Sequence, residues 1–361
     1  MRTLVVSDLH LGSRQDADVL RRHDAALGAL RDAIADCQRL VLLGDVIELR
    51  QRPLPDALTA ALPVLSALGH ALPGEAEVIV VPGNHDHHLL TAWRDRLLGA
   101  GTPVRLGLET AVDWVAGEAL STVARALGGD DRVRAAYPGV WLRDDVYAIH
   151  GHYGDRHTTV PMLERLGAGA MARIAGEPSD GPHSPDDYET VLAPIYAWIH
   201  ELAQHDGPRL RRSSQGTSAR AWQTLAGSSG RRSLRRRALT ALFPALVLGL
   251  SRTGLGPLHA DLSGPELRRA ALLAAGESLQ RLNVSAPFVI FGHTHRAGPL
   301  DRDDRSEWRT DGGASLINSG CWVYERAFLG DEPSRSPYRP GFVVRLDDDG
   351  PPALVNLLDT A

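Results

Sequence analysis

Residues 78–86 read VIVVPGNHD, a short apolar run that ends in a turn followed by polar side chains. A continuous apolar run of this length is typical of a strand that is buried on both faces. Four other runs have the same form, each followed directly or after one residue by Asp, His or Asn: 4–6, 39–43, 146–149 and 288–291. Each of the five is predicted to be a strand that presents polar groups beyond its carboxyl end.

Helix-length stretches separate the first three runs. Residues 16–35 and 55–68 both carry apolar side chains at helical spacing. This alternation predicts an α/β fold with a largely parallel sheet and helical crossovers. Three further strands are predicted near the end of the chain, at 316–318, 341–346 and 354–357. Since ligands of open α/β sheets bind beyond the carboxyl ends of the strands, the polar residues are expected to meet at one edge.

Five short motifs follow the five runs in order, and together they predict a metal site. They are Asp8-Leu9-His10, Gly44-Asp45, Gly83-Asn84-His85-Asp86, His150-Gly151-His152 and Gly292-His293-Thr294-His295. Carboxylate, imidazole and amide oxygen suit borderline divalent ions such as Mn, Fe, Zn or Co. A single D-x-H or H-x-H is weak on its own. The complete set, with every member at a strand end, is specific.

Spacing within the motifs supports this interpretation. Residues i and i+2 of an extended segment point the same way, so Asp8 and His10 can reach one ion. His293 and His295 are expected to flank the site from the other side. The glycines before Asp45, Asn84 and His293 allow sharp turns and a close approach of the backbone.

The ordered set D-x-H, G-D, G-N-H-D, H and G-H-x-H resembles the calcineurin-like metallophosphoesterase superfamily, over residues 1–150 and 288–361. The resemblance implies a four-layer αββα sandwich of two mixed sheets with an inserted helical cap. It implies two divalent metal ions, with Mn²⁺ first and Fe or Zn as alternatives. It also implies hydrolysis of a phosphomonoester, phosphodiester or diphosphate bond by water activated between the two ions.

The same resemblance assigns roles to residues. The implied ligands of one ion are Asp8, His10 and His295, and those of the other are Asn84, His150 and His293, with Asp45 bridging. His85 is the implied catalytic residue, lying over the substrate phosphate to stabilise charge or to protonate the leaving oxygen. His150 is preferred to His152 because it directly follows its apolar run. The residues that bind the rest of the substrate stay unknown.

The second motif indicates a subgroup. Residues 44–50 read GDVIELR, which departs from the G-D-x-V-D-R-G of Ser/Thr protein phosphatases. The runs SDLHLG (7–12) and LGDVIE (43–48) are more similar to bacterial UDP-2,3-diacylglucosamine diphosphatases and their relatives. Glu48 lies where phosphatases have an acid that orients the catalytic histidine, so a Glu48–His85 pair is predicted. The alternative is a solvated glutamate at a helix start.

The whole chain, 1–361, is predicted to be one metallophosphoesterase domain with a mainly helical, Arg-rich insertion at about 155–285. Helix-like patches occur there at 188–204 and 265–282. The stretch 207–260 contains ten arginines and no acidic residue, although the chain has a net charge of −5. A short apolar stretch, 238–250, follows most of these arginines. Three roles stay open for the Arg-rich stretch: a cap packed on the rest of the protein, contact with an anionic membrane surface or lipid-linked substrate, and binding of nucleic acid.

The composition of the chain also bears on its cellular location and on alternative functions. The 361 residues include no long apolar run and no signal-peptide pattern at the N-terminus, so a cytoplasmic protein, with peripheral membrane contact as an option, is predicted. Two distant cysteines, Cys37 and Cys321, indicate no disulfide framework. Besides a phosphoesterase for a small or lipid-linked substrate, the alternatives are a nuclease and a catalytically silent scaffold. The scaffold is disfavoured because every implied ligand and His85 are present.

Overall fold

The computed structural model describes residues 1–14, 17–101, 105–159, 163–175, 177–178, 180–204, 264–330 and 332–359. Contacts divide the chain into two compact units. The first comprises Met1–His152, Ile199–Asp206 and Ser285–Ala361, and the second comprises Tyr153–Trp198 and Gly207–Val284. The Arg-rich stretch 207–260 lies outside the described residues. The assignment of 155–285 as an insertion in one domain stays a prediction.

The described part of the first unit contains a ten-stranded mixed sheet. Its strands are β1 (Thr3–Val6), β2 (Arg39–Leu43), β3 (Glu77–Val81), β4 (Glu109–Val112), β5 (Val133–Arg143), β6 (Val146–Ile149), β7 (Phe288–Phe291), β8 (Ser315–Asn318), β9 (Phe342–Leu346) and β10 (Ala353–Asn356). The order is β10-β9-β1-β2-β3-β5-β6-β7-β8, with β4 paired to β5. Strands β1, β2, β3 and β5 are parallel neighbours, as are β6, β7 and β8.

All eight predicted strands are confirmed, with bounds that differ by no more than one residue. Strands β4 and β5 were not predicted. Strand β5 contains Pro138 and Gly139 in its interior, and these residues weaken a strand pattern. The first half of β5 pairs with β3 and β4, and its second half pairs with β6, so this one strand joins the two parallel groups.

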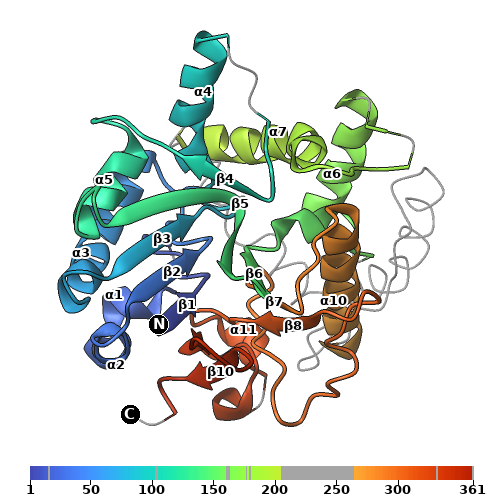
Figure 1. The fold of residues 1–361 in the computed structure, drawn as a ribbon. Coiled ribbons are helices and arrows are strands. Elements are labelled where there is room, and N and C mark those ends of the chain that lie inside the picture. Colours follow the sequence, from blue (N-terminus) through green and yellow to red (C-terminus); the bar gives the residue numbers. More distant parts are fainter. Residues whose placement is uncertain are drawn as a thin grey trace, which may run out of the picture. The chain divides into compact units, whose positions relative to one another are not determined.

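The helices described in the first unit are α1 (Val19–Arg22), α2 (Asp24–Ile34), α3 (Leu54–Ala71), η1 (His87–Leu90), α4 (Thr91–Gly99), α5 (Ala119–Ala126), α11 (Arg326–Leu329) and η5 (Pro333–Arg335). Helix 16–35 was predicted as continuous, but His23 adopts an extended backbone and divides it into α1 and α2. Helices α2, α3 and α5 lie against one face of β1, β2 and β3 (Figure 1), and their apolar residues share one buried cluster with those strands.

Side chains on the other face of the sheet form a second buried cluster. It contains residues of β1, β2 and β3 together with residues of β6, β7 and β8, for example Val41, Ile79, Ala148 and Ile290. The mixed α/β fold is therefore confirmed. The division into two sheets of a four-layer sandwich stays a prediction.

The second unit is described through α6 (Leu163–Ala175), most of α7 (Pro185–Gln204), α10 (Gly264–Arg281) and part of η2 (His152–Arg156). The helix-like patches 188–204 and 265–282 are confirmed. Inside this unit Tyr153 stacks on Tyr188 at 4.5 Å and donates a hydrogen bond to Glu189. No helix among the described residues is long and apolar enough to cross a membrane. Cys37 and Cys321 are buried free thiols.

Candidate metal centre

Five predicted ligands share an unusual backbone conformation. Among the described residues, six that are not glycine have a positive φ, and five of these are Asp8 (55°), His10 (45°), Asp45 (53°), His293 (66°) and His295 (58°). L-residues adopt this left-handed region at a cost, and such residues concentrate at functional sites. All five follow the carboxyl ends of β1, β2 and β7, so the left-handed conformation occurs where the polar motifs meet.

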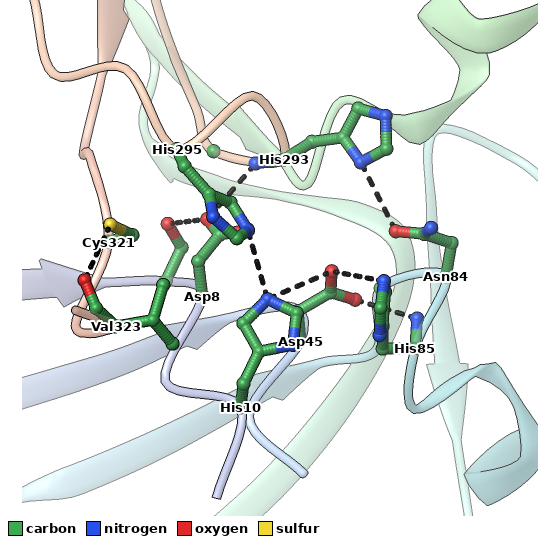
Figure 2. A network of polar contacts seen from close by, with 12 residues as sticks. Asp8, His10, Asp45, Asn84, His85, His293, His295, Cys321 and Val323 are labelled. Atoms are coloured by element: carbon green, nitrogen blue, oxygen red, sulfur yellow. Dashed lines mark hydrogen bonds and ion pairs between the residues drawn. The ribbon is translucent and has the colours of Figure 1, made fainter. Parts of the chain in front are cut away.

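The first group of convergent atoms comes from the loops after β1 and β7 (Figure 2). His10 Nε2 lies 3.0 Å from His295 Nε2 and 3.9 Å from Asp8 Oδ1, and His295 Nε2 lies 3.4 Å from Asp8 Oδ1. Asp8 Oδ2 accepts hydrogen bonds from the Ser7 hydroxyl and from the His293 N–H. Within the described part of the chain, the buried Oδ1 has no hydrogen-bond partner. It is therefore available to a cation.

The second group comes from the loops after β2, β3, β6 and β7. His150 Nε2 lies 3.3 Å from Asp45 Oδ2 and 3.2 Å from Asn84 Oδ1. His293 Nδ1 also lies 3.2 Å from Asn84 Oδ1 (Figure 2). Because His150 Nδ1 donates to the Leu43 carbonyl at 2.9 Å, its Nε2 is the ring nitrogen that faces this group.

Asp45 faces both groups. Its Oδ1 accepts the His85 backbone N–H at 2.8 Å, which fixes the carboxylate. Its Oδ2 lies 3.7 Å from His10 Nε2 in the first group and 3.3 Å from His150 Nε2 in the second. This geometry suits a carboxylate oxygen shared by two ions.

The residues fit two divalent cations. His10 Nε2 and His295 Nε2 lie 3.0 Å apart, close enough for both rings to bind one cation through these atoms. Bonds of about 2.1 Å to one ion put neighbouring ligand atoms about 3.0–3.4 Å apart. Most of the observed separations lie in or near that range. The donors are imidazole, carboxylate and amide oxygen, the set that borderline metals such as Mn, Fe and Zn accept.

The electrostatics of the site also favour cations. Burial opposes protonation of His10, but its hydrogen bond to Glu48 and the charges of Asp45, Glu48 and Asp8 raise its pKa to about 9. Burial likewise opposes protonation of His150, yet Asp45 and Asp8 raise its pKa to about 10. A field that stabilises an imidazolium also stabilises a metal ion, which is the larger local charge.

Glu48 links the predicted catalytic histidine to a predicted ligand. Its Oε2 lies 2.8 Å from His85 Nδ1 and 3.1 Å from His10 Nδ1, and the Glu48 side chain is buried. The predicted Glu48–His85 pair is confirmed, whereas the contact with His10 was not foreseen. With Nδ1 engaged, His85 directs Nε2 toward the site, 4.0 Å from Asp45 Oδ2. This placement also brings His85 within reach of a cation near His10 and Asp45.

The structure separates His150 from His152. His150 joins the second group, whereas the buried His152 lies 3.0 Å from the Tyr137 hydroxyl through its Nε2. Asn318 was not identified from the sequence. Its side-chain amide donates to the Gly292 carbonyl at 2.8 Å and to the Thr294 hydroxyl at 2.9 Å, which orders the loop after β7. Its signal was available, because Asn318 ends an apolar run as the other site residues do.

Two of the glycines have the expected reason. A methyl group at Gly44, where φ is 82°, would overlap the ring of His150. One at Gly292 would overlap the carboxylate of Asp8 and the hydroxyl of Ser7. The backbone thus approaches ligand side chains that only glycine leaves room for.

One of three comparisons with known proteins identifies a family for this chain. A model of the calcineurin-like phosphoesterase family matches residues 1–214. No curated protein matches the chain. A crystal structure of a dimetal phosphatase from Danio rerio is similar at 16% identity with a TM-score of 0.33, over 99% of each chain. Because the family model covers more than half of the sequence, this protein belongs to the calcineurin-like phosphoesterase family and is a metallophosphoesterase, a hydrolase of phosphoric ester bonds.

Proposed function

We propose that this protein hydrolyses a phosphomonoester, phosphodiester or diphosphate bond with two divalent ions, Mn²⁺ being the first candidate. The convergence of two ligand groups on Asp45 Oδ2 supports the proposal. Asp8, His10 and His295 would hold one ion, Asn84, His150 and His293 would hold the other, and Asp45 would be shared between them. When bound, two such ions polarise phosphoryl oxygens and lower the pKa of water.

The protein groups around the ions have separate tasks. Asp8 and Asp45 orient their carboxylates through backbone and hydroxyl contacts, so little reorganisation is needed when substrate enters. His85 keeps Nε2 directed at the site because Glu48 accepts the hydrogen of Nδ1. From there His85 can donate a hydrogen bond to a phosphoryl oxygen or a proton to the leaving oxygen.

A substrate panel tests the proposal. The metal-free protein is titrated with Mn²⁺ and offered a chromogenic phosphomonoester, a phosphodiester, a UDP-linked lipid and single-stranded DNA. Hydrolysis of at least one ester is expected, with dependence on Mn²⁺ and loss in a chelator. Two bound ions without hydrolysis of any substrate would instead favour a catalytically silent scaffold.

The same panel separates the finer proposals. A lipid-linked diphosphate is supported by the similarity of residues 7–12 and 43–48 to UDP-2,3-diacylglucosamine diphosphatases and by the Arg-rich stretch 207–260. Peripheral contact with an anionic membrane would follow from the same arginines. Preference for the UDP-linked lipid is expected. Preference for DNA, with steep salt dependence, would favour the nuclease.

We also propose that the two parallel groups of strands pack face to face as the inner layers of a four-layer sandwich. The support is the buried cluster that β1, β2 and β3 share with β6, β7 and β8. A crystal structure tests this, and an open, single-layered sheet would contradict it.

Glu48→Gln is expected to lower turnover about 10- to 100-fold, the usual cost of losing a partner that orients a ligand. The substitution removes the negative charge of Glu48, which orients both His85 and His10. Turnover and Mn²⁺ affinity are measured together, and both are expected to fall.

Glu77→Gln is the matched control, because Glu77 pairs with Arg39 and Arg134 at the opposite end of β3. Combined with His85→Ala, Glu48→Gln should have a smaller effect on turnover than it has alone, since part of its role acts through that ring. Full additivity of the two changes would argue against the Glu48–His85 link.

A further inference from the structure

Asp86 ends the G-N-H-D motif and has no metal-facing role in the site described above. It is fully buried, and its two oxygens accept four backbone N–H groups. Oδ1 accepts from Gly83 at 2.6 Å and from Asp45 at 3.2 Å. Oδ2 accepts from Val46 at 2.8 Å and from Ile47 at 3.3 Å. One carboxylate therefore binds the backbone of two loops, the one after β2 and the one after β3.

The bonds made by Asp86 reach both proposed ligand loops. Gly83 precedes Asn84 after β3, and Asp45 is itself the proposed bridging ligand after β2. Asp45 has a left-handed backbone, a conformation that costs free energy and persists only when neighbouring contacts impose it. The N–H groups of Asp45, Val46 and Ile47 point together at Asp86, so its negative charge can offset that cost.

The loop after β1 is attached to the loop that Asp86 holds. Asp8 N–H donates to the Gly44 carbonyl at 3.0 Å, and His10 N–H donates to the Asp45 carbonyl at 2.8 Å. Leu11 N–H donates to the Val46 carbonyl at 2.9 Å. A displacement of the β2 loop would therefore move two proposed ligands of the first ion as well as Asp45.

We propose that Asp86 is a positioning residue that fixes Asp45, Asn84 and, through Asp45, the loop of Asp8 and His10 in the metal-binding arrangement before any ion binds. This inference rests on the proposed ligand set. The donors and the acceptor of the four hydrogen bonds are all groups of the chain, so the bonds need no ion. The inference therefore requires that they exist in the metal-free protein. It also makes Asp86 distinct from Glu48, which orients side-chain rings, since Asp86 orients the backbone.

The first experiment uses the native protein alone. Hydrogen exchange of the Asp45, Val46 and Ile47 amides is compared in a chelator and with saturating Mn²⁺. The proposal predicts that these amides are already protected without metal. Protection that appears only when Mn²⁺ is added would overturn the proposal, because the ion would then order the loop.

The second experiment uses Asp86→Asn, which keeps the shape but turns one acceptor into a donor that faces N–H groups. The Mn²⁺ dissociation constant of the folded protein is expected to rise about 10- to 100-fold. Exchange at Val46 and Ile47 should become faster in the chelator. At saturating Mn²⁺ the turnover of Asp86→Asn should return most of the way to the native value. A merely structural role would not produce this shift in metal dependence.

Asp187→Asn is the matched control, because Asp187 also accepts two backbone N–H groups, from His183 and Ser184, in the second unit. It should leave the Mn²⁺ dissociation constant unchanged. An Asp86→Asn protein that binds Mn²⁺ as tightly as the native protein would refute the proposal. If the native protein binds no Mn²⁺, the proposed function fails, and the exchange experiment still tests Asp86. The exchange experiment on the native protein also tests the role of Asp86 if Asp86→Asn does not fold.

Discussion

Asp45→Asn is expected to reduce the metal content from two ions per chain to one or none and to lower turnover by about 10³-fold or more. The amide can still accept the His85 N–H through its oxygen, so the loop should stay in place. It removes the negative charge of the oxygen that faces both His10 and His150. An amide nitrogen there cannot bind a cation.

Elemental analysis after dialysis against Mn²⁺ measures the first effect, and hydrolysis of a chromogenic ester measures the second. Asp187→Asn, the same chemical change in the second unit, should keep two ions and native turnover. Two conditions would count against the assignment: native protein that saturates with a single ion, or Asp45→Asn that still retains both.

His85→Ala is expected to keep two ions and to lower turnover about 10²- to 10⁴-fold, the range for loss of general acid catalysis or charge stabilisation. Nδ1 of His85 is engaged by Glu48, so its Nε2 is the atom available to substrate. The KM for a soluble ester should change much less than kcat, because the lost contact is strongest in the transition state.

The control is His183→Ala, which removes an exposed histidine that pairs with Asp180. It should leave both metal content and kcat unchanged. Loss of an ion from His85→Ala would instead make His85 a ligand, a role that its proximity to His10 and Asp45 permits. Unchanged turnover would remove it from the catalytic machinery.

The strand ends could be predicted from the sequence because both signals are local. A run such as Arg39–Leu43 is apolar throughout, and Gly44-Asp45 ends it. Strand β5 could not be predicted in the same way. Its Pro138 and Gly139 contradict a strand locally, and its pairing with both β3 and β6 comes from residues distant in sequence. The break at His23 was missed because helical spacing of apolar residues continues across it.

The candidate site divides along the same line. Sequence indicated which residue types belong to it, and His150 was preferred to His152 because it directly follows a strand. Sequence could not indicate that one Glu48 oxygen lies near both His10 and His85. Nor could it indicate that Asp86 accepts N–H groups from two loops, since the contact between residues 45 and 86 depends on β2 and β3 being adjacent.

By itself the sequence determined the family, the α/β class and the residues that can bind metal, because these follow from motif order and apolar periodicity along the chain. Tertiary structure alone decided which oxygen of Asp45 faces both ligand groups, that Glu48 contacts His10 as well as His85, and which carboxylate accepts N–H groups from the loops after β2 and β3. These are matters of distance between atoms far apart in sequence. They are fixed only when parallel strands align their carboxyl ends and burial removes the water that would otherwise bind each polar group.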